Sequence, residues 1–142
     1  MTPVFADTLY WVALVRPNDP WRDAANQAFL AITNAEIVTT DEVLIEFLSS
    51  MSKGSAVIRQ TAVQVVQTIL ADPGVRVIAQ THEGFMAGLS LFESRPDKQY
   101  SLTDCISMDV MKSEGIRAVL TNDHHFAQEG FQVLIEHGKR DV

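Results

Sequence analysis

Four acidic side chains lie beside the predicted ends of strands or starts of helices: Asp7, Glu46, Asp104 and Asp123. Asp7 and Asp123 each follow a short apolar run, and Asp104 comes three residues after Ser101, a residue type that caps helices. In an α/β sheet, the carboxyl ends of strands and the N-termini of helices face one crevice. The spacing therefore predicts that the four carboxylates converge.

Converging carboxylates with no lysine or arginine in their motifs would repel one another and raise each other's pKa values. A divalent cation relieves this repulsion. Mg²⁺ or Mn²⁺ suits the site, because each takes oxygen ligands, whereas the supply of His and Cys is poor for zinc. Ions held in this way stabilise charge on phosphate oxygens and activate a water, which is what cleavage of a phosphodiester requires. Asp7 and Asp104 are predicted to be the firmest ligands, and Glu46 or Asp123 to position the attacking water.

The choice between two glutamates is left open by the spacing. Glu42 and Glu46 lie four residues apart in a predicted helix, so they share one of its faces. A glutamate at either position also fits the solvated flank of an amphipathic helix.

Several polar residues beside the acids are weaker candidates. Thr103 and Asn122 are placed to orient ligands or contact phosphate, and Ser101 is interpreted as a helix cap. His124 and His125 have the chemistry of general acids. Because they are adjacent at the start of a surface turn, the pattern favours their interpretation as polar loop residues.

Short apolar runs alternate with helical patterns along the chain. Strands are expected at residues 4–6, from residue 37, and at 75–78, 116–120 and 131–135. Helices are expected at residues 9–15, 21–32, 41–51, 57–70, 82–92, 102–114 and 125–129. The alternation predicts the α/β fold class, as a three-layer α/β/α sandwich around a mostly parallel five-stranded sheet. The polar tail from Glu136 is expected to be frayed.

Length and composition limit the class of protein. With 142 residues, 46% of them hydrophobic, the chain is expected to form one domain, residues 1–142. No apolar run approaches the ~20 residues of a membrane span, and the start lacks a secretion signal, so a cytoplasmic protein is expected. A net charge of −7 argues against a broad basic surface for nucleic acid. The single cysteine, Cys105, lies in an apolar helical pattern and is interpreted as a buried side chain.

The segments FADT, TTDEVLIEFL, SLTDC and LTND, at these intervals, resemble the PIN-domain ribonucleases, and the length is similar to that of VapC-type toxins. The resemblance implies a PIN-like fold with Asp7, Glu46, Asp104 and Asp123 as its acidic quartet, so it favours Glu46 over Glu42. It also implies Mg²⁺- or Mn²⁺-dependent endonuclease activity on RNA. Such an enzyme is frequently a homodimer that a small antitoxin protein silences.

Other classes of protein fit less well. A phosphoacceptor signalling domain needs an aspartate at the end of its middle strand, where this chain has Ala79 and Gln80. A phosphatase with an aspartyl nucleophile would have a second acid two residues after Asp7, where Leu9 stands. The remaining alternative is a PIN-like binding or scaffold module without catalytic activity, and metal-dependent cleavage of RNA separates it from the enzyme.

Overall fold

The computed structural model describes residues 1–136 and contains a five-stranded sheet in the order β3-β2-β1-β4-β5, with every pairing parallel. The strands are β1 (Thr2–Ala6), β2 (Ala35–Thr40), β3 (Val75–Ile78), β4 (Ala118–Leu120) and β5 (Gln132–Val133). The helices are α1 (Thr8–Val15), α2 (Arg22–Ala31), α3 (Asp41–Ser50), α4 (Ala56–Ala71), α5 (His82–Ser94), α6 (Leu102–Ser113) and α7 (His124–Gln128). The predicted α/β/α sandwich is confirmed, and its sheet is wholly parallel where a mostly parallel one was expected.

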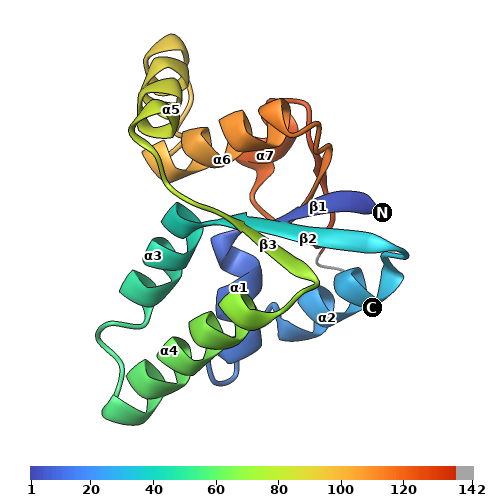
Figure 1. Ribbon diagram of the computed structural model, residues 1–142, viewed down its shortest axis with the longest axis vertical. Helices are drawn as coiled ribbons and strands as arrows, with labels where there is room; N and C mark the ends of the chain where they lie inside the picture. The colour runs from blue at the N-terminus through green and yellow to red at the C-terminus, as the bar shows by residue number, and fades with distance from the viewer. Residues whose placement is uncertain (137–142) are drawn as a thin grey trace.

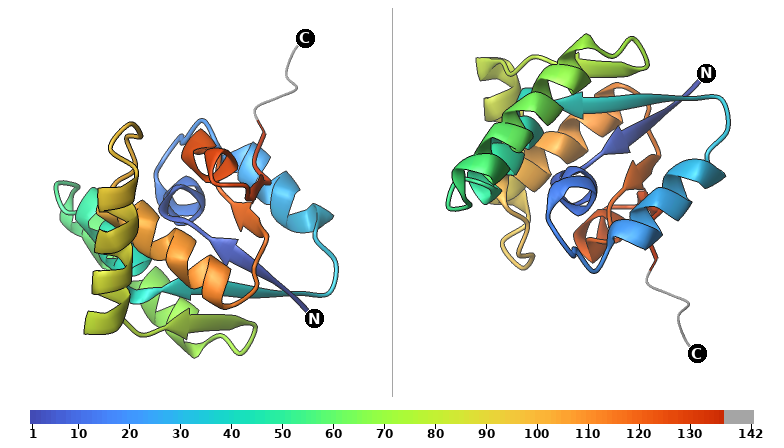
Figure 2. Two further views of the ribbon diagram at one scale, coloured as in Figure 1. Left: turned by 90° about the horizontal axis from the view of Figure 1, so that it is seen from above. Right: turned by 90° about the horizontal axis from the view of Figure 1, so that it is seen from below.

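Helices cover both faces of the sheet. Figure 1 shows α5, α6 and α7 on one side and α1, α2 and α4 on the other. The two further views in Figure 2 agree, with α6 lying across the sheet in one and α1, α2 and α4 in front of it in the other. A parallel sheet requires this arrangement, because its strands are apolar on both faces. None of the helices in the described part of the chain has the length and apolarity needed to cross a bilayer.

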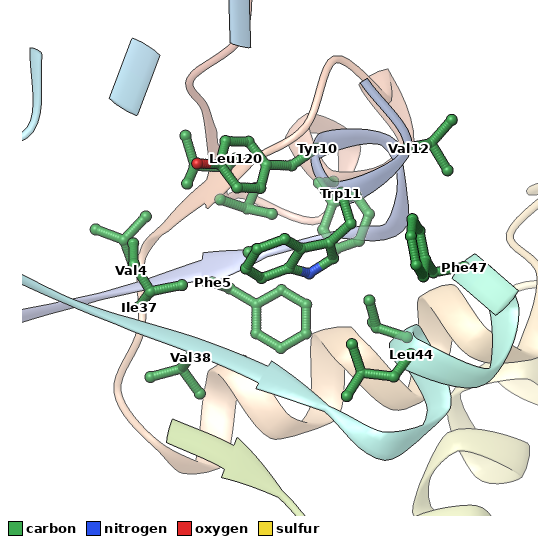
Figure 3. Close-up of a cluster of buried hydrophobic side chains, with 14 of the residues drawn as sticks. Val4, Phe5, Tyr10, Trp11, Val12, Ile37, Val38, Leu44, Phe47 and Leu120 are labelled. Carbon is green, nitrogen blue, oxygen red and sulfur yellow. The ribbon is translucent and has the colours of Figure 1, made fainter. Parts of the chain in front are cut away.

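The core joins the middle of the sheet to α1 and α3. Phe5, Val38 and Val119, from the three central strands, are completely buried. Figure 3 shows side chains of β1, α1, β2 and α3 gathered in one cluster, with Phe47 at its α3 side. Two hydrogen bonds lie within this cluster. Trp11 Nε1 donates to Thr39 Oγ1 at 3.4 Å, and Thr39 Oγ1 donates to the Ala6 carbonyl at 2.9 Å. This packing fixes where β1 ends and where α3 begins.

Short connections follow the strands that lead to the acids. One residue, Asp7, separates β1 from α1, and β2 runs directly into α3. Thr40 caps α3 by accepting a hydrogen bond from the Val43 N–H at 3.1 Å, and threonine is a residue type preferred at this position. With no loop to absorb variation, the acids beside these junctions have fixed positions relative to the sheet.

The last two strands are shorter than predicted. After α6, the Ile116 N–H donates to the Met111 carbonyl at 2.8 Å and Gly115 has a φ of +70°, so the helix end extends to residue 116 and β4 begins only at Ala118. Beyond β5, the Leu134 and Ile135 N–H groups still bond to β4 and its exit, but no regular ladder forms. The expected fraying of the tail concerns residues 137–142, which lie outside the described residues.

Candidate metal centre

Asp7 is a buried acid at the carboxyl end of the central strand. The register of β1 and β4 pairs Ala6 with Leu120, so the next residues, Asp7 and Thr121, lie side by side where both strands end. Thr121 Oγ1 donates a hydrogen bond of 2.9 Å to Asp7 Oδ2. Asp7 occupies the N-cap position of α1, yet its side chain makes no capping hydrogen bond. The carboxylate is therefore available to the crevice rather than committed to starting the helix.

The environment of Asp7 disfavours its charge. Burial raises the pKa of Asp7 from 3.8 to about 7, and the nearby charges of Asp104 and Glu46 contribute to the rise. The Thr8 N–H and the Thr121 hydroxyl counteract it in part. Among residues 1–136, no lysine or arginine forms a salt bridge with any of the four predicted acids. The negative charge of this group is thus not compensated by a lysine or arginine of the described chain.

Glu46 approaches Asp7 from the second turn of α3. The hydroxyl of Thr8, the residue after Asp7, donates a short hydrogen bond to Glu46 Oε1. This bond ties the first turn of α1 to α3. Glu42 lies one turn earlier and instead lines a cavity of about 410 Å³ together with Phe85 and other residues outside the acidic group. The structure therefore places Glu46 near Asp7 and Glu42 at a different cavity, a distinction that their spacing in the sequence could not make.

Asp104 is held at the start of α6 by a reciprocal capping box. Its backbone N–H donates to Ser101 Oγ at 3.0 Å, and its Oδ2 accepts from the Ser101 N–H at 3.1 Å. Burial raises the pKa of Asp104, and the charges of Asp123 and Glu46 add to the rise. Asp104 is therefore both a helix cap and a member of an acidic group whose charges repel.

Asp123 begins the short helix α7 and brings a histidine with it. Asp123 Oδ1 accepts from the His125 N–H at 2.9 Å, and the Asp123 N–H donates to Thr121 Oγ1 at 3.2 Å. The His125 ring turns back, so that its Nδ1 lies 3.2 Å from Asp123 Oδ1 and 3.6 Å from Asp104 Oδ2. One potential ligand atom from each of Asp104, Asp123 and His125 lies within 4.8 Å of the others. This spacing allows the three side chains to share one ion.

A family model described as "PIN domain" matches residues 4–131. The chain belongs to the PIN domain family. The match includes every residue of the acidic group, and it confirms the resemblance that four short segments indicated. A comparison with curated proteins finds no match.

Three solved structures are similar in fold to this chain, and their alignments cover 90–93% of it. VapC20 from Mycobacterium tuberculosis, described as a sarcin-ricin loop cleaving toxin, is 23% identical, with a TM-score of 0.81 over 90% of this chain and 95% of that one. VapBC2 from Rickettsia felis, bound to a promoter DNA fragment, is 15% identical, with a TM-score of 0.68 over 93% and 97%. FitAcB from Neisseria gonorrhoeae is 11% identical, with a TM-score of 0.68 over 92% and 96%. At these identities the likeness shows the fold.

The PIN domain brings the predicted acids together to different degrees. Asp104 and Asp123 form a close group with His125. Asp7 and Glu46 lie outside that group of ligand atoms but near enough for their charges to act on it, since Glu46 affects both Asp7 and Asp104. The site is therefore a compact acidic group with two further carboxylates beside it.

The weaker candidates from the sequence have different positions and contacts in the structure. Ser101 is a cap, as expected, and His124 is exposed but begins α7, where a loop residue was expected. Asn122 donates its Nδ2 to the Ile135 carbonyl at 2.6 Å, so its amide secures the segment after β5. Thr103 is half-buried in the first turn of α6. Cys105 is fully buried, which confirms its interpretation as a core side chain.

Two residues that contact the acids, Thr8 and Thr121, were not selected from the sequence, and a third, His125, was interpreted there as a polar loop residue, whereas it lies half-buried in α7. Each stands next to or two residues from a predicted acid, and Thr8 and Thr121 lie inside the segments FADT and LTND. Adjacency was the available signal. It could not show which hydroxyl or ring would turn toward an acid, because these contacts form between elements distant in sequence.

Proposed function

We propose that this PIN domain, spanning residues 1–142, is a Mg²⁺- or Mn²⁺-dependent endoribonuclease and the toxin of a toxin–antitoxin pair. The observation that supports it most directly is the group of half-buried and buried acids at the carboxyl end of the sheet, which no lysine or arginine of residues 1–136 neutralises. Maintaining such a group against mutual repulsion costs stability, and a divalent cation offsets that cost.

The donor set fits a hard divalent cation. Asp7, Glu46, Asp104 and Asp123 would hold it, since all four offer carboxylate oxygens, and the pKa values of Asp7 and Asp104 are raised by burial and further by the charges of neighbouring acids. A bound ion supplies charge stabilisation at the phosphate oxygens and an acidified water. Glu46 or Asp123 would orient the attacking water.

Neighbouring groups of the chain would keep these acids in place. Thr8 holds Glu46, Thr121 holds Asp7, and the Ser101 N–H holds Asp104. Each of these donors bonds to a carboxylate oxygen and fixes the orientation of that carboxylate. Preorganisation of this kind lets the acids act without rearranging during the reaction.

RNA is the proposed substrate. The solved structure of VapC20 is of a toxin that cleaves the sarcin-ricin loop, and the sequence segments of the acidic quartet support the same substrate class here. With a net charge of −7, the chain offers no general attraction for nucleic acid. Bound cations would then be the local attraction for phosphate.

Two protein partners are proposed, a second copy of the chain and an antitoxin. Helix α5, which projects from the body in Figure 1, exposes four large apolar side chains by 40–48%: Phe85, Met86, Leu89 and Phe92. An apolar helix face of this kind supports a homodimer through α5. A groove of about 650 Å³ between α3 and α4, lined by Leu48, Met51 and Val63 among others, offers a second apolar surface for an antitoxin segment.

Cleavage of a mixed RNA pool tests the enzymatic proposal. We expect cutting by the intact protein in Mn²⁺ or Mg²⁺, no cutting in chelator, and none by Asp104→Asn in either metal. If the folded protein leaves the pool intact in both metals, the alternative of a binding or scaffold module is correct. Light scattering of the intact protein and of Leu89→Glu tests the dimer, and an unchanged mass would remove α5 from it.

A further inference from the structure

His125 has a ring nitrogen that is buried without a hydrogen bond. Among the described residues, Nδ1 of His125 is one of the side-chain polar atoms that are enclosed and lack a hydrogen-bond partner, although the ring as a whole is 30% exposed. Enclosing a polar atom without a partner is costly, and native structures rarely do so without a reason. The surroundings of this nitrogen supply the reason.

The Nδ1 atom faces two carboxylates at distances that suit shared coordination. It lies 3.2 Å from Asp123 Oδ1 and 3.6 Å from Asp104 Oδ2. Two ligands at right angles around an octahedral ion with bonds of about 2.1 Å stand about 3 Å apart. Both distances from Nδ1 are therefore close to the spacing of neighbouring ligands around one ion. The same distances also suit ion pairs between the ring and the two carboxylates, so nitrogen coupling to a bound ion is the measurement that distinguishes a ligand from an ion-pair partner.

The ring is supported from behind by a separate set of contacts. The ring of Tyr100 packs against that of His125 with a centroid distance of 5.3 Å. Tyr100 donates its hydroxyl to Glu129 Oε2 at 2.8 Å, and Glu129 also accepts two hydrogen bonds from Arg95, at 2.7 and 3.1 Å. Support of this kind is what orients a ligand side chain before it meets its ion.

We propose that His125 Nδ1 is a metal ligand beside Asp104 and Asp123, and that it makes this site select Mn²⁺ over Mg²⁺. Mg²⁺ is a hard cation that is bound through oxygen, whereas an imidazole nitrogen favours first-row transition metals. The inference rests on the metal site of the proposed function, but it concerns which ion binds and through which atom, and both are measurable without RNA.

Electron spin-echo spectroscopy of the metal-free protein loaded with one equivalent of Mn²⁺ tests the inference. A nitrogen bound directly to the ion couples to its electron spin, and ¹⁵N-labelling of histidine must change that signal. We expect the coupling in the intact protein and in the matched control His124→Gln, and its loss in His125→Gln. Titration calorimetry should show a Mn²⁺ dissociation constant raised about tenfold or more in His125→Gln, with the Mg²⁺ constant changed by less than about twofold.

Each outcome decides a different point. Mn²⁺ bound without nitrogen coupling in the intact protein overturns the role of His125, whatever the stability of the variants. Coupling that persists in His125→Gln and disappears in His124→Gln overturns it as well. A protein that binds Mn²⁺ through nitrogen but does not cleave RNA keeps this inference and loses the proposed function, and failure to bind Mn²⁺ at all contradicts both.

Discussion

The two ends of α7 carry carboxylates in opposite electrostatic surroundings. At its C-terminal end, Glu129 accepts hydrogen bonds from Arg95 and Tyr100, and the bonds from Arg95 are the largest cause of its lowered pKa. At its N-terminal end, Asp123 belongs to an acidic group with Asp104. There, burial and neighbouring charges raise the pKa of Asp104. A carboxylate is paired with an arginine at one end of α7, and at the other end a carboxylate has no lysine or arginine partner among residues 1–136.

The difference teaches how to separate structural acids from functional ones in this fold. A buried carboxylate with its own cation and donors stabilises the folded chain, whereas a group of acids without a cation weakens it. Such a group is retained when it serves a ligand, which is the usual origin of a conflict between stability and activity. Four substitutions test this contrast, from the largest expected effect to the smallest.

Asp7→Asn should remove most of the pH dependence of stability in chelator between about pH 4 and 7. The folded pKa of Asp7, about 7, exceeds the ordinary value of 3.8, so its neutral form favours folding. That stabilisation is complete below about pH 3.8 and is lost as the pH rises through about 7. The shift corresponds to at most about 4 kcal/mol. Denaturant unfolding at several pH values measures it, with the exposed Asp23→Asn as control. Equal pH profiles for Asp7→Asn and the intact protein would contradict the assignment.

Asp104→Asn should lower metal-dependent RNA cleavage by at least about 100-fold, because it removes a charged ligand from the group. The matched control is Asp109→Asn, five residues later on α6 and about 140° around the helix, which should retain activity within about twofold. In chelator, Asp104→Asn should melt no lower than the intact protein, since it relieves repulsion. A large loss of activity in both variants would place the site elsewhere.

Glu46→Gln should lower cleavage about tenfold or more, whereas Glu42→Gln should leave it within about twofold. Glu46 accepts a hydrogen bond from Thr8, the residue after Asp7, whereas Glu42 lines a different cavity. Single-turnover rates measured with enzyme in saturating excess over RNA and with saturating Mn²⁺ make the comparison independent of RNA binding. The reverse order of the two effects would show that Glu42 completes the acidic group.

Glu129→Gln should lower the free energy of unfolding by about 1 kcal/mol, because it weakens bonds to a charged acceptor. The pH dependence has the opposite sign to that of Asp7. The folded pKa of Glu129 is below its ordinary value of 4.5, so its stabilisation is complete above about pH 4.5 and is lost as the pH falls through the lowered pKa. Unfolding at pH 3 to 6 should therefore show the intact protein and the variant converging toward acid. A difference in the free energy of unfolding that stays constant with pH would show that the ionised form of Glu129 is not stabilised by its bonds to Arg95 and Tyr100.

Much of the architecture followed from local pattern. Apolar runs located all five strands, and Ser101 marked the start of α6, which the structure contains. Strand lengths were less predictable. Whether β4 starts at residue 116 or at Ala118 depends on how the preceding helix closes at Gly115, and the run of apolar residues gives no sign of it.

The sequence by itself determined that Asp7, Asp104 and Asp123 stand at strand ends and helix starts, because capping and hydrophobic periodicity act over a few residues. The tertiary structure alone decided which partners those acids meet. The bond from Thr8 to Glu46 spans 38 residues of chain and that from Thr121 to Asp7 spans 114, so each exists only after α1, α3 and the central strands have packed. The orientation of the His125 ring toward the acids was also decided by the tertiary structure. Its direction depends on the Tyr100 ring and on Asp104, both brought from other segments, and no spacing within the chain records those contacts.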